Sequence, residues 1–324
     1  MLDEIEKRLL LPVGSLELPK SFTLPRYDSD GVIHTEEDPN YRSNPEYVPE
    51  IDPTYVMQVE QATLALIACE SGVPTQAYGV SGSGKTTFWE QFAGRLGREL
   101  RVIQCLKGMT EKTLLGKQDF VSDEKGTRTP FALGPLPSYI SYPGAIVLLD
   151  EQDVLDDAVG FVLQPLLKRG GVLRISELGD NGNIYPAENV WVVSTTNTVN
   201  GVDETGTYTR TLQDASQVDR FLCKIPFPPP DERKILKGKW GEFLADETID
   251  ALVRFAHGFR QSPELQSNLF STRRLVFIGE IAAKYGSTEL ALRTALFNEL
   301  PAGPLRETAR NLAIHENLAR PEVG

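Results

Sequence analysis

The feature that most constrains this chain is a glycine-rich stretch at residues 79–86. It reads Gly-Val-Ser-Gly-Ser-Gly-Lys-Thr and fits G-x-x-x-x-G-K-[ST], the pattern of a phosphate-binding P-loop. Glycines let the backbone turn tightly and approach a phosphate, where a side chain would block contact. Successive N–H groups at the start of the following helix then bind the anion. The pattern predicts that Lys85 reaches the β- and γ-phosphates and that the Thr86 hydroxyl binds Mg²⁺.

The residues on both sides favour this interpretation over a Gly/Ser-rich turn with an exposed lysine. Residues 74–78 read as a short strand, and apolar residues recur near helical spacing over residues 88–100. Strand, loop and helix in this order form the context that a P-loop requires. The residues expected to bind the nucleotide phosphates form one continuous run: Gly79, Val80, Ser81, Gly82, Ser83, Gly84, Lys85, Thr86 and Thr87.

Polar residues follow two further strand patterns. Residues 145–149 are continuously apolar, as in a parallel strand buried on both faces, and Asp150 and Glu151 come directly after them. Residues 190–193 form a similar run, and the polar stretch that follows ends at Asn197. Ligands of open α/β sheets bind at the carboxyl ends of strands, so these side chains are expected beside the P-loop. The alternatives are a helix cap for the acidic pair and a loop cap for the asparagine.

The chain is expected to fold in three parts. Residues 1–50 are rich in proline and poor in apolar residues, which leaves open a loosely packed extension or an arm that docks on a partner or neighbouring subunit. Residues 51–228 carry strand and helix patterns that predict an α/β domain with a parallel sheet. Residues 229–324 carry helical patterns and predict a small all-α domain. Two segments of the α/β domain stand apart: an irregular stretch at residues 113–136, and a hairpin with a Gly-Asp-Asn-Gly turn at residues 174–186.

Composition narrows the function. The 324 residues have a net charge of -12, which argues against broad binding to nucleic-acid phosphates. The three histidines lie far apart and the three cysteines form no C-x-x-C pair, so neither residue type indicates a metal centre. The first residues lack the apolar core of a signal peptide, and no apolar run approaches the roughly 20 residues of a membrane span. These features favour a cytoplasmic protein with reduced thiols.

Together, these motifs resemble those of AAA+ ATPases. Besides the P-loop and the two polar strand ends, the chain has Asp-Arg-Phe at residues 219–221 and a helical C-terminal part, as these ATPases do. The stretch Phe-Ala-Leu-Gly-Pro-Leu at residues 131–136 resembles the MoxR branch of the family. Four segments are similar to CobS-like proteins, which are named after the small ATPase subunit of aerobic cobaltochelatase: residues 48–56, 115–117, 196–198 and 206–221. The resemblance implies a P-loop AAA+ αβα sandwich followed by a helical lid.

The resemblance also implies a role for each matching residue. Gly79, Gly84, Lys85 and Thr86 would form the Walker A motif. Asp150 would hold Mg²⁺ through water, and Glu151 would polarise the attacking water. As sensor 1, Asn197 would position that water.

Two arginines would complete such a site. Arg220, in Asp-Arg-Phe, would be the arginine finger that one subunit projects into its neighbour's site, and Arg273 would be the sensor 2 residue of the lid. The family often has Ser-Pro-Arg where this chain has Ser-Thr-Arg, so Arg274 is an alternative for that role. From the residues alone, the first arginine can also be structural and the second can pair with a lid carboxylate. Residues 113–136 would be the helix 2 insert facing a central pore, and residues 174–186 the pre-sensor 1 insert.

The implied function is a Mg²⁺-dependent, ATP-hydrolysing motor that forms a ring of identical subunits, a hexamer by analogy, and remodels a protein partner. ATP is chosen over GTP on the resemblance, because a P-loop binds phosphates and not the base. The family often works with a von Willebrand A domain protein, so a CobT-like partner is implied. Three alternatives stay open: a cobaltochelatase motor subunit proper, a nucleic-acid-directed motor, and a non-hydrolysing nucleotide-gated scaffold. CobS-like ATPases also occur in bacteriophages, so the expected cytoplasm is the host's if the chain is phage-encoded.

Overall fold

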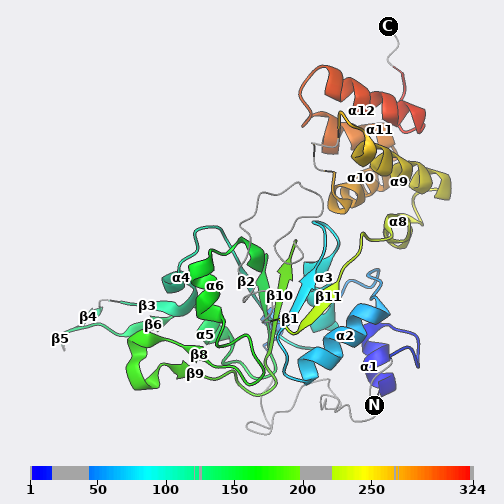
Figure 1. The fold of residues 1–324 in the computed structure, drawn as a ribbon. Coiled ribbons are helices and arrows are strands. Elements are labelled where there is room, and N and C mark those ends of the chain that lie inside the picture. The colour runs from blue at the N-terminus through cyan, green and yellow to red at the C-terminus, as the bar shows by residue number, and fades with distance from the viewer. Residues whose placement is uncertain are drawn as a thin grey trace. The chain divides into compact units, whose positions relative to one another are not determined.

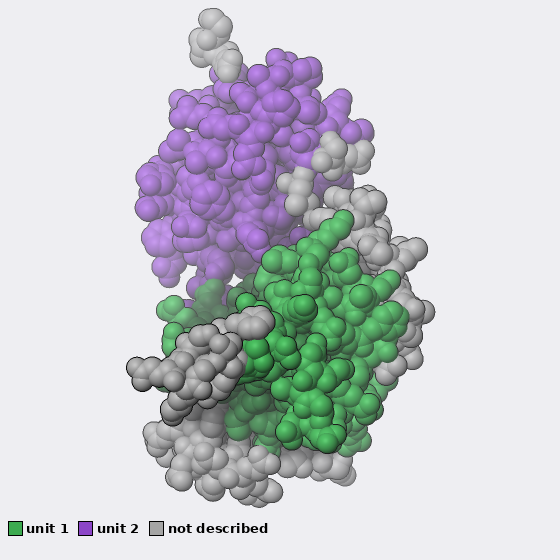
Figure 2. Space-filling model, turned by 90° about the vertical axis from the view of Figure 1, so that its left-hand side faces the viewer, with its two compact units in different colours: residues 1–52, 57–80, 84–227 green, residues 53–56, 81–83, 228–324 purple. Residues whose placement is uncertain are grey.

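The computed structural model describes residues 2–16, 44–119, 121–123, 126–197, 221–265, 268 and 270–321. The chain divides into two compact units, which Figure 2 colours separately. The first contains residues 1–52, 57–80 and 84–227, and the second contains residues 53–56, 81–83 and 228–324. The first unit is built on a parallel sheet with helices and the second is helical, so the predicted α/β fold with an all-α C-terminal part is confirmed.

A five-stranded parallel sheet forms the centre of the first unit (Figure 1). The strand order is β11-β1-β10-β7-β2, and each neighbouring pair is parallel. The strands are β1 Thr75–Tyr78, β2 Leu100–Gln104, β7 Ile146–Asp150, β10 Trp191–Thr196 and β11 Cys223–Pro226. Because β1 pairs with β10 and β10 pairs with β7, the residues that follow these three strands meet at one edge of the sheet.

Helices cover both faces of the sheet. All five residues of β7 and all six of β10 are buried, as expected for strands that pack on both sides. Figure 1 shows α2 and α3 on one face and α4, α5 and α6 on the other. Their bounds are α2 Val59–Glu70, α3 Lys85–Arg95, α4 Glu111–Leu115, α5 Pro135–Tyr139 and α6 Asp157–Leu163. Phe88 and Phe92 of α3 are fully buried, and burial of each contributes roughly 1.5–3 kcal/mol to stability.

The described residues of the N-terminal arm pack against α3. They include α1 Leu2–Leu9 and the 3-10 turn η1 Pro45–Tyr47. The Arg95 guanidinium of α3 donates hydrogen bonds to the carbonyl oxygens of Leu9 and Asp52, each at 2.9 Å. One helix therefore holds both α1 and the segment that follows η1.

Residues 113–136 contain a two-part hairpin. β3 Gly116–Gln118 pairs antiparallel with β6 Phe131–Leu133, and β4 Val121–Asp123 pairs antiparallel with β5 Gly126–Arg128. Figure 1 shows β4 and β5 at the tip of this hairpin, with α4 at its base. Gly116 has φ 125°, and a Cβ there would overlap a carbonyl oxygen of β6, so the junction between α4 and β3 requires glycine.

The segment after β7 differs in detail from its sequence pattern. Apolar spacing predicts a helix over residues 154–170, interrupted at its proline, and α6 ends at Leu163, before that proline. β8 Leu173–Arg174 and β9 Asn183–Ile184 pair antiparallel, so a hairpin is present. The 3-10 turns of η3 Ser176–Asn181 join its strands in place of the tight turn that Gly-Asp-Asn-Gly predicts.

The second unit is a helical bundle with its own apolar core. Its helices are α8 Glu232–Trp240, α9 Asp246–Gln261, α10 Thr272–Tyr285, α11 Thr288–Leu292, the π-helical turn η4 Arg293–Phe297 and α12 Pro304–His315. The side chains of Asp231, Ser271 and Ser287 begin α8, α10 and α11, because each accepts a hydrogen bond from a backbone N–H three residues on. Within the described ranges, none of the helices combines the length and apolar character needed to cross a membrane.

Candidate nucleotide-binding site

The P-loop residues lie between the carboxyl end of β1 and the start of α3. Gly82 and Gly84 have φ values of 80° and 90°, which favour glycine, and a Cβ on Gly79 would overlap the Phe227 carbonyl oxygen. No side chain caps the N-terminus of α3. The first N–H groups of this helix therefore have no helical partner and can bind an anion.

Lys85 links the P-loop to the residue that follows β10. Its side chain is 7% exposed, and its Nζ donates to the carbonyl oxygens of Gly79 at 2.8 Å and Val80 at 3.0 Å. It also donates to Asn197 Oδ1 at 2.9 Å. A buried ammonium is costly unless its N–H groups are hydrogen-bonded, so these acceptors hold the amine at the loop.

Asp150, the last residue of β7, is buried and faces the first turn of α3. Its Oδ1 accepts hydrogen bonds from the Thr86 hydroxyl at 2.8 Å and from the Thr195 hydroxyl at 2.6 Å. Carboxylate and hydroxyl oxygens suit Mg²⁺, which is commonly held by few protein ligands together with phosphates and water. In the part of the chain that the structure describes, no group of three or more His, Cys, Asp or Glu side chains is arranged to hold a metal. The donor set therefore fits Mg²⁺ carried by a nucleotide better than a metal held by protein ligands alone.

Glu151 has an unusual backbone for a residue with a side chain. Its φ of 55° and ψ of 44° lie in the left-handed region, which costs such a residue about 1–2 kcal/mol. Its N–H donates to Thr195 Oγ1 at 2.9 Å, which holds this conformation. Backbone strain of this kind gathers at functional sites, so the conformation points to a role for the Glu151 carboxylate.

Asn197 lies directly after β10 and is held from two sides. Its carboxamide oxygen accepts from Lys85, and its backbone N–H donates to Asp153 Oδ2 at 3.1 Å. The structure thus brings five of the predicted site residues to one edge of the sheet. They are Lys85, Thr86, Asp150, Glu151 and Asn197.

The predicted arginines have separate outcomes. Arg220 lies outside the described residues. Arg273 is exposed in the first turn of α10 and, among the described residues, makes no hydrogen bond or ion pair. Arg274, the alternative for the sensor 2 role, pairs with Glu299 at 2.6 Å. The two candidates for sensor 2 therefore differ, because the Arg274 guanidinium is already paired with a carboxylate and that of Arg273 is exposed.

The sequence motifs did not identify two residues of this site, Thr195 and Asp153. Thr195 contacts both members of the acidic pair, and Asp153 holds the backbone after β10. Thr195 stands in a Ser-Thr-Thr stretch whose hydroxyls all look alike in the sequence. Asp153 follows the acidic pair closely, and that clustering of carboxylates was the available signal.

Cys105 lies just after β2, beside the acidic residues. Its backbone N–H donates to the Asp150 carbonyl oxygen at 2.9 Å. Burial, together with the negative charges of Asp150, Asp153 and Glu151, raises the pKa of the Cys105 thiol to about 12. The thiol therefore stays protonated at neutral pH, which makes it a poor nucleophile.

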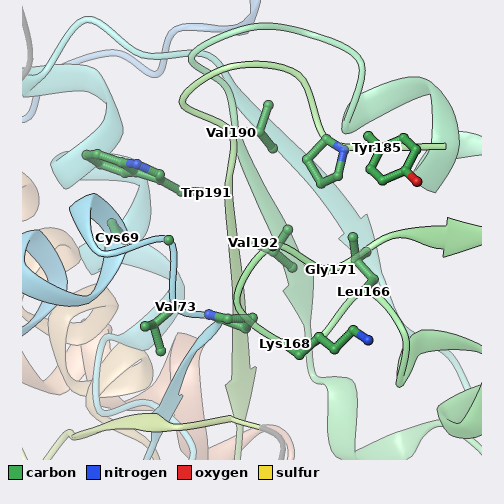
Figure 3. Close-up of a pocket in the computed structure, with 13 residues that line it drawn as sticks. Cys69, Val73, Leu166, Lys168, Gly171, Tyr185, Val190, Trp191 and Val192 are labelled. Carbon is green, nitrogen blue, oxygen red and sulfur yellow. The ribbon is translucent and has the colours of Figure 1, made fainter.

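A cavity of about 260 Å³ lies at the opposite edge of the sheet, by the amino ends of β1 and β10. Figure 3 shows Lys168 and Tyr185 on one side of β10, and Cys69 and Val73 on the other. None of the predicted site residues lines it. Because open α/β sheets bind ligands at the carboxyl ends of their strands, the nucleotide site is the P-loop edge and not this cavity.

Fold and site together define the class of protein, a P-loop nucleoside triphosphatase. A family model described as an AAA domain of the dynein-related subfamily matches residues 78–212. Over 271 residues, the chain is 30% identical to the aerobic cobaltochelatase subunit CobS of a Sinorhizobium species, covering 81% of this chain and 80% of CobS. The chain belongs to the AAA+ ATPases, in the MoxR branch near CobS, and is an ATP-hydrolysing enzyme, as the sequence motifs predict.

Two further comparisons agree with this assignment. Protein NorQ of Paracoccus denitrificans is 26% identical over 250 residues, which cover 76% of this chain and 87% of NorQ. A solved structure of the Hsp104:casein complex of S. cerevisiae, in an extended conformation, matches with a TM-score of 0.50. That match has 19% identity and covers 75% of this chain and 45% of the Hsp104 chain, so it shows a shared fold alone.

Proposed function

We propose that this chain is a Mg²⁺-dependent motor that assembles into a ring, a hexamer by family analogy, and uses ATP hydrolysis to remodel a protein partner. The observation that supports hydrolysis is the meeting of two hydrogen-bonded pairs at one edge of the sheet, Lys85 with Asn197 at 2.9 Å and Thr86 with Asp150 at 2.8 Å, whereas the ring and the partner are proposed from the family. Phosphoryl transfer depends on positioning and on stabilising negative charge, and this set supplies both.

Each residue has a defined part in this reaction. The backbone N–H groups of residues 79–87 bind the phosphates, and Lys85 adds positive charge at the β- and γ-phosphates. Thr86 and Asp150 would hold Mg²⁺, which when bound neutralises charge on the phosphate oxygens. Glu151 polarises the attacking water, and the Asn197 carboxamide orients it.

Arginines complete the proposed site. Arg273 serves as sensor 2, because its guanidinium is exposed and that of Arg274 is paired with Glu299. Arg220 acts as the arginine finger of a neighbouring subunit. In GTPases such an arginine finger raises kcat roughly 10³–10⁵-fold, so hydrolysis would depend on assembly. Head-to-tail contacts that place one residue in the next site form a ring when the rotation from one subunit to the next closes.

The motor's partner is proposed from the family. A protein with a von Willebrand A domain, similar to CobT, would bind the ring, and the hairpin of β3 to β6 would face the pore as the helix 2 insert. The β8–β9 hairpin would be the pre-sensor 1 insert. The proposed location is the cytoplasm, or the host cytoplasm for a phage-encoded chain.

A second candidate is the cobaltochelatase motor subunit itself, favoured by the 30% identity to CobS. Metal insertion would then occur on another subunit, because the described residues hold no cluster of metal-ligating side chains. Mixing the chain with the large chelatase subunit and a CobT-like subunit tests this. Cobalt insertion that depends on the chain would support this candidate, and none in the complete mixture would exclude it.

Glu151→Gln tests the proposed hydrolysis. The variant should lose about 10²–10⁴-fold in kcat, the usual contribution of a general base, and should still bind ATP with Mg²⁺. Glu60→Gln, the same chemical change at an exposed position of α2, is the control and should leave turnover unchanged. Undiminished turnover in Glu151→Gln would remove Glu151 from its role, and a wild-type chain without turnover would remove hydrolysis itself.

A further inference from the structure

One buried hydroxyl joins both acidic residues that follow β7. Thr195, in β10, is 1% exposed. Its Oγ1 donates to Asp150 Oδ1 at 2.6 Å and accepts from the Glu151 backbone N–H at 2.9 Å. A hydroxyl has one proton to donate and lone pairs to accept, so this side chain uses both capacities on neighbouring residues of the other strand.

The consequence for Asp150 is a fixed carboxylate. Its Oδ1 accepts the hydroxyl of Thr195 at 2.6 Å and that of Thr86 at 2.8 Å. These donors come from two different elements, β10 and α3, so the carboxylate is restrained by more than its own strand. Without Thr195 the carboxylate would lose the shorter of these two bonds.

The consequence for Glu151 concerns its backbone. A residue with a side chain stays in the left-handed region only where its surroundings require it, and Glu151 has φ 55° and ψ 44°. The hydrogen bond from its N–H to Thr195 is such a requirement. The direction of the Glu151 side chain follows from this backbone, so Thr195 controls where the carboxylate points.

A second bridge lies beside the first. Asp153 is 3% exposed, and its Oδ2 accepts the backbone N–H of Asn197 at 3.1 Å. It belongs to the 3-10 turn η2 Gln152–Val154 that follows β7, and Asn197 follows β10. Two side chains therefore connect the ends of these strands: Thr195 of β10 bonds to the residues at the end of β7, and Asp153 after β7 bonds to the residue after β10.

We propose that Thr195 is a positioning residue for hydrolysis, which aligns Asp150 and Glu151, and that Asp153 does the same for Asn197. This inference rests on the proposed function, because it assigns the water-polarising role to Glu151. Neither residue touches the reacting atoms, and both act through the residues that they hold. Misplacing a reacting group by about 1 Å costs about 10²-fold in rate, so small shifts at this edge are enough to slow hydrolysis.

A matched control stands next to Thr195 on the same strand. Ser194 is fully buried, and its hydroxyl has no hydrogen-bond partner among the described residues. Successive residues of a strand point to opposite faces of the sheet, so Ser194 points away from the face that Thr195 occupies. Removing its hydroxyl tests the loss of a buried hydroxyl from β10 without touching the acidic pair.

The experiment compares Thr195→Val, Thr195→Ser and Ser194→Ala in the full chain, with steady-state ATP turnover and ADP binding measured for each. Thr195→Val keeps the shape and loses the hydroxyl, and its kcat should fall about 10–100-fold while KM and ADP affinity stay within about threefold. Thr195→Ser keeps the hydroxyl and should restore most of the turnover. Ser194→Ala should match the wild type.

Several results would overturn the inference. Thr195→Val with wild-type kcat would remove Thr195 from positioning, and equal losses in Thr195→Val and Thr195→Ser would show a role in packing. Asp153→Ala tests the second bridge in the same assay, with the same expected loss in kcat at unchanged KM, and if Thr195→Val does not fold, Thr195→Ala removes the same hydroxyl. A wild-type chain without turnover would refute the proposed function, whereas an active wild type with active Thr195 and Asp153 variants would refute this inference alone.

Discussion

At Glu151, the demands of chemistry and of backbone geometry conflict. The proposed role needs a carboxylate, and the left-handed conformation favours glycine. The chain keeps the glutamate and restrains its N–H with the Thr195 hydroxyl. Strain of about 1–2 kcal/mol is therefore retained at the position assigned to water activation.

This conflict predicts that glycine is more stabilising than alanine at position 151, the reverse of their usual order in a helix. Glu151→Gly should be more stable than Glu151→Ala by about 1 kcal/mol, because alanine keeps the left-handed strain and glycine relieves it. Urea unfolding followed by the fluorescence of Trp89 and Trp191, both buried in the first unit, measures the difference. At Glu280, exposed in the middle of α10, unfolding followed by Trp240 should give the reverse order, because glycine is about 1 kcal/mol worse than alanine in a helix interior. If the glycine and alanine variants ranked in the same order of stability at both positions, Glu151 would not be strained.

Single residues also mark the limit of what the sequence could show at the site. Lys85, Asp150 and Asn197 could be selected because a motif or a strand end placed each of them. Thr195 and Asp153 could not, because a threonine in a strand and an aspartate after one are common. Their importance lies in hydrogen bonds across neighbouring strands, which depend on the register of β7 and β10.

Among the helices, the start of α10 shows how a buried acid orders the segment that carries Arg273. Glu232 of α8 is 5% exposed, and its carboxylate accepts from Arg260 at 2.6 and 2.9 Å and from the Thr272 hydroxyl at 2.6 Å. Arg260 also donates to the Phe270 carbonyl oxygen at 2.8 Å. These bonds fix the first residue of α10, and Arg273 is the next residue. The threonine that departs from the family's Ser-Pro-Arg thus has a hydrogen-bonding role of its own.

We expect Glu232→Ala to destabilise the second unit by about 1.5–3 kcal/mol, since it removes hydrogen bonds to a charged group. Asp250→Ala removes an exposed ion pair with Arg233, which water and salt screen, and should cost clearly less than Glu232→Ala. Denaturant unfolding followed by Trp240, in the second unit, compares the variants. Equal costs would contradict the anchoring role of Glu232.

The sheet could be predicted from the sequence more fully than the connections could. Residues 145–149 form an uninterrupted apolar run, which only a buried strand or helix allows, and they correspond to β7 within one residue. The segment after α6 was less predictable. Its Gly-Asp-Asn-Gly stretch fits a tight turn, and the chain forms 3-10 turns there instead, with a break at Gly179, whose φ of 56° is not helical. Several turn types are compatible with this glycine-rich stretch, so the sequence alone does not select among them.

At the scale of the whole molecule, the proposed function requires more than one chain. Lys85, Thr86, Asp150, Glu151 and Asn197 all belong to the first unit. The charge that a neighbouring Arg220 would supply cannot come from these residues. The net charge of -12 adds a second constraint, because it disfavours nucleic acid as the substrate and leaves a protein partner as the proposed one.

A nucleic-acid motor would bind DNA in a salt-sensitive manner and would hydrolyse ATP faster in its presence, and we expect neither property here. DNA should neither bind the chain in a salt-sensitive manner nor stimulate its ATP turnover. Turnover measured with and without DNA over a range of salt concentrations checks both. Stimulation that weakens as salt rises would contradict the choice of a protein partner.

The central claim is that hydrolysis occurs at a site completed by a neighbouring chain, and one measurement tests it directly. ATP turnover per chain is followed against protein concentration, with the mass at each point from light scattering, for the wild type and Arg220→Ala. The account predicts that turnover rises steeply as rings form, and that Arg220→Ala assembles and binds ATP but loses about 10³-fold or more in turnover. Turnover that stays constant with concentration, together with a fully active Arg220→Ala, would contradict the claim and make the chain a self-contained P-loop enzyme.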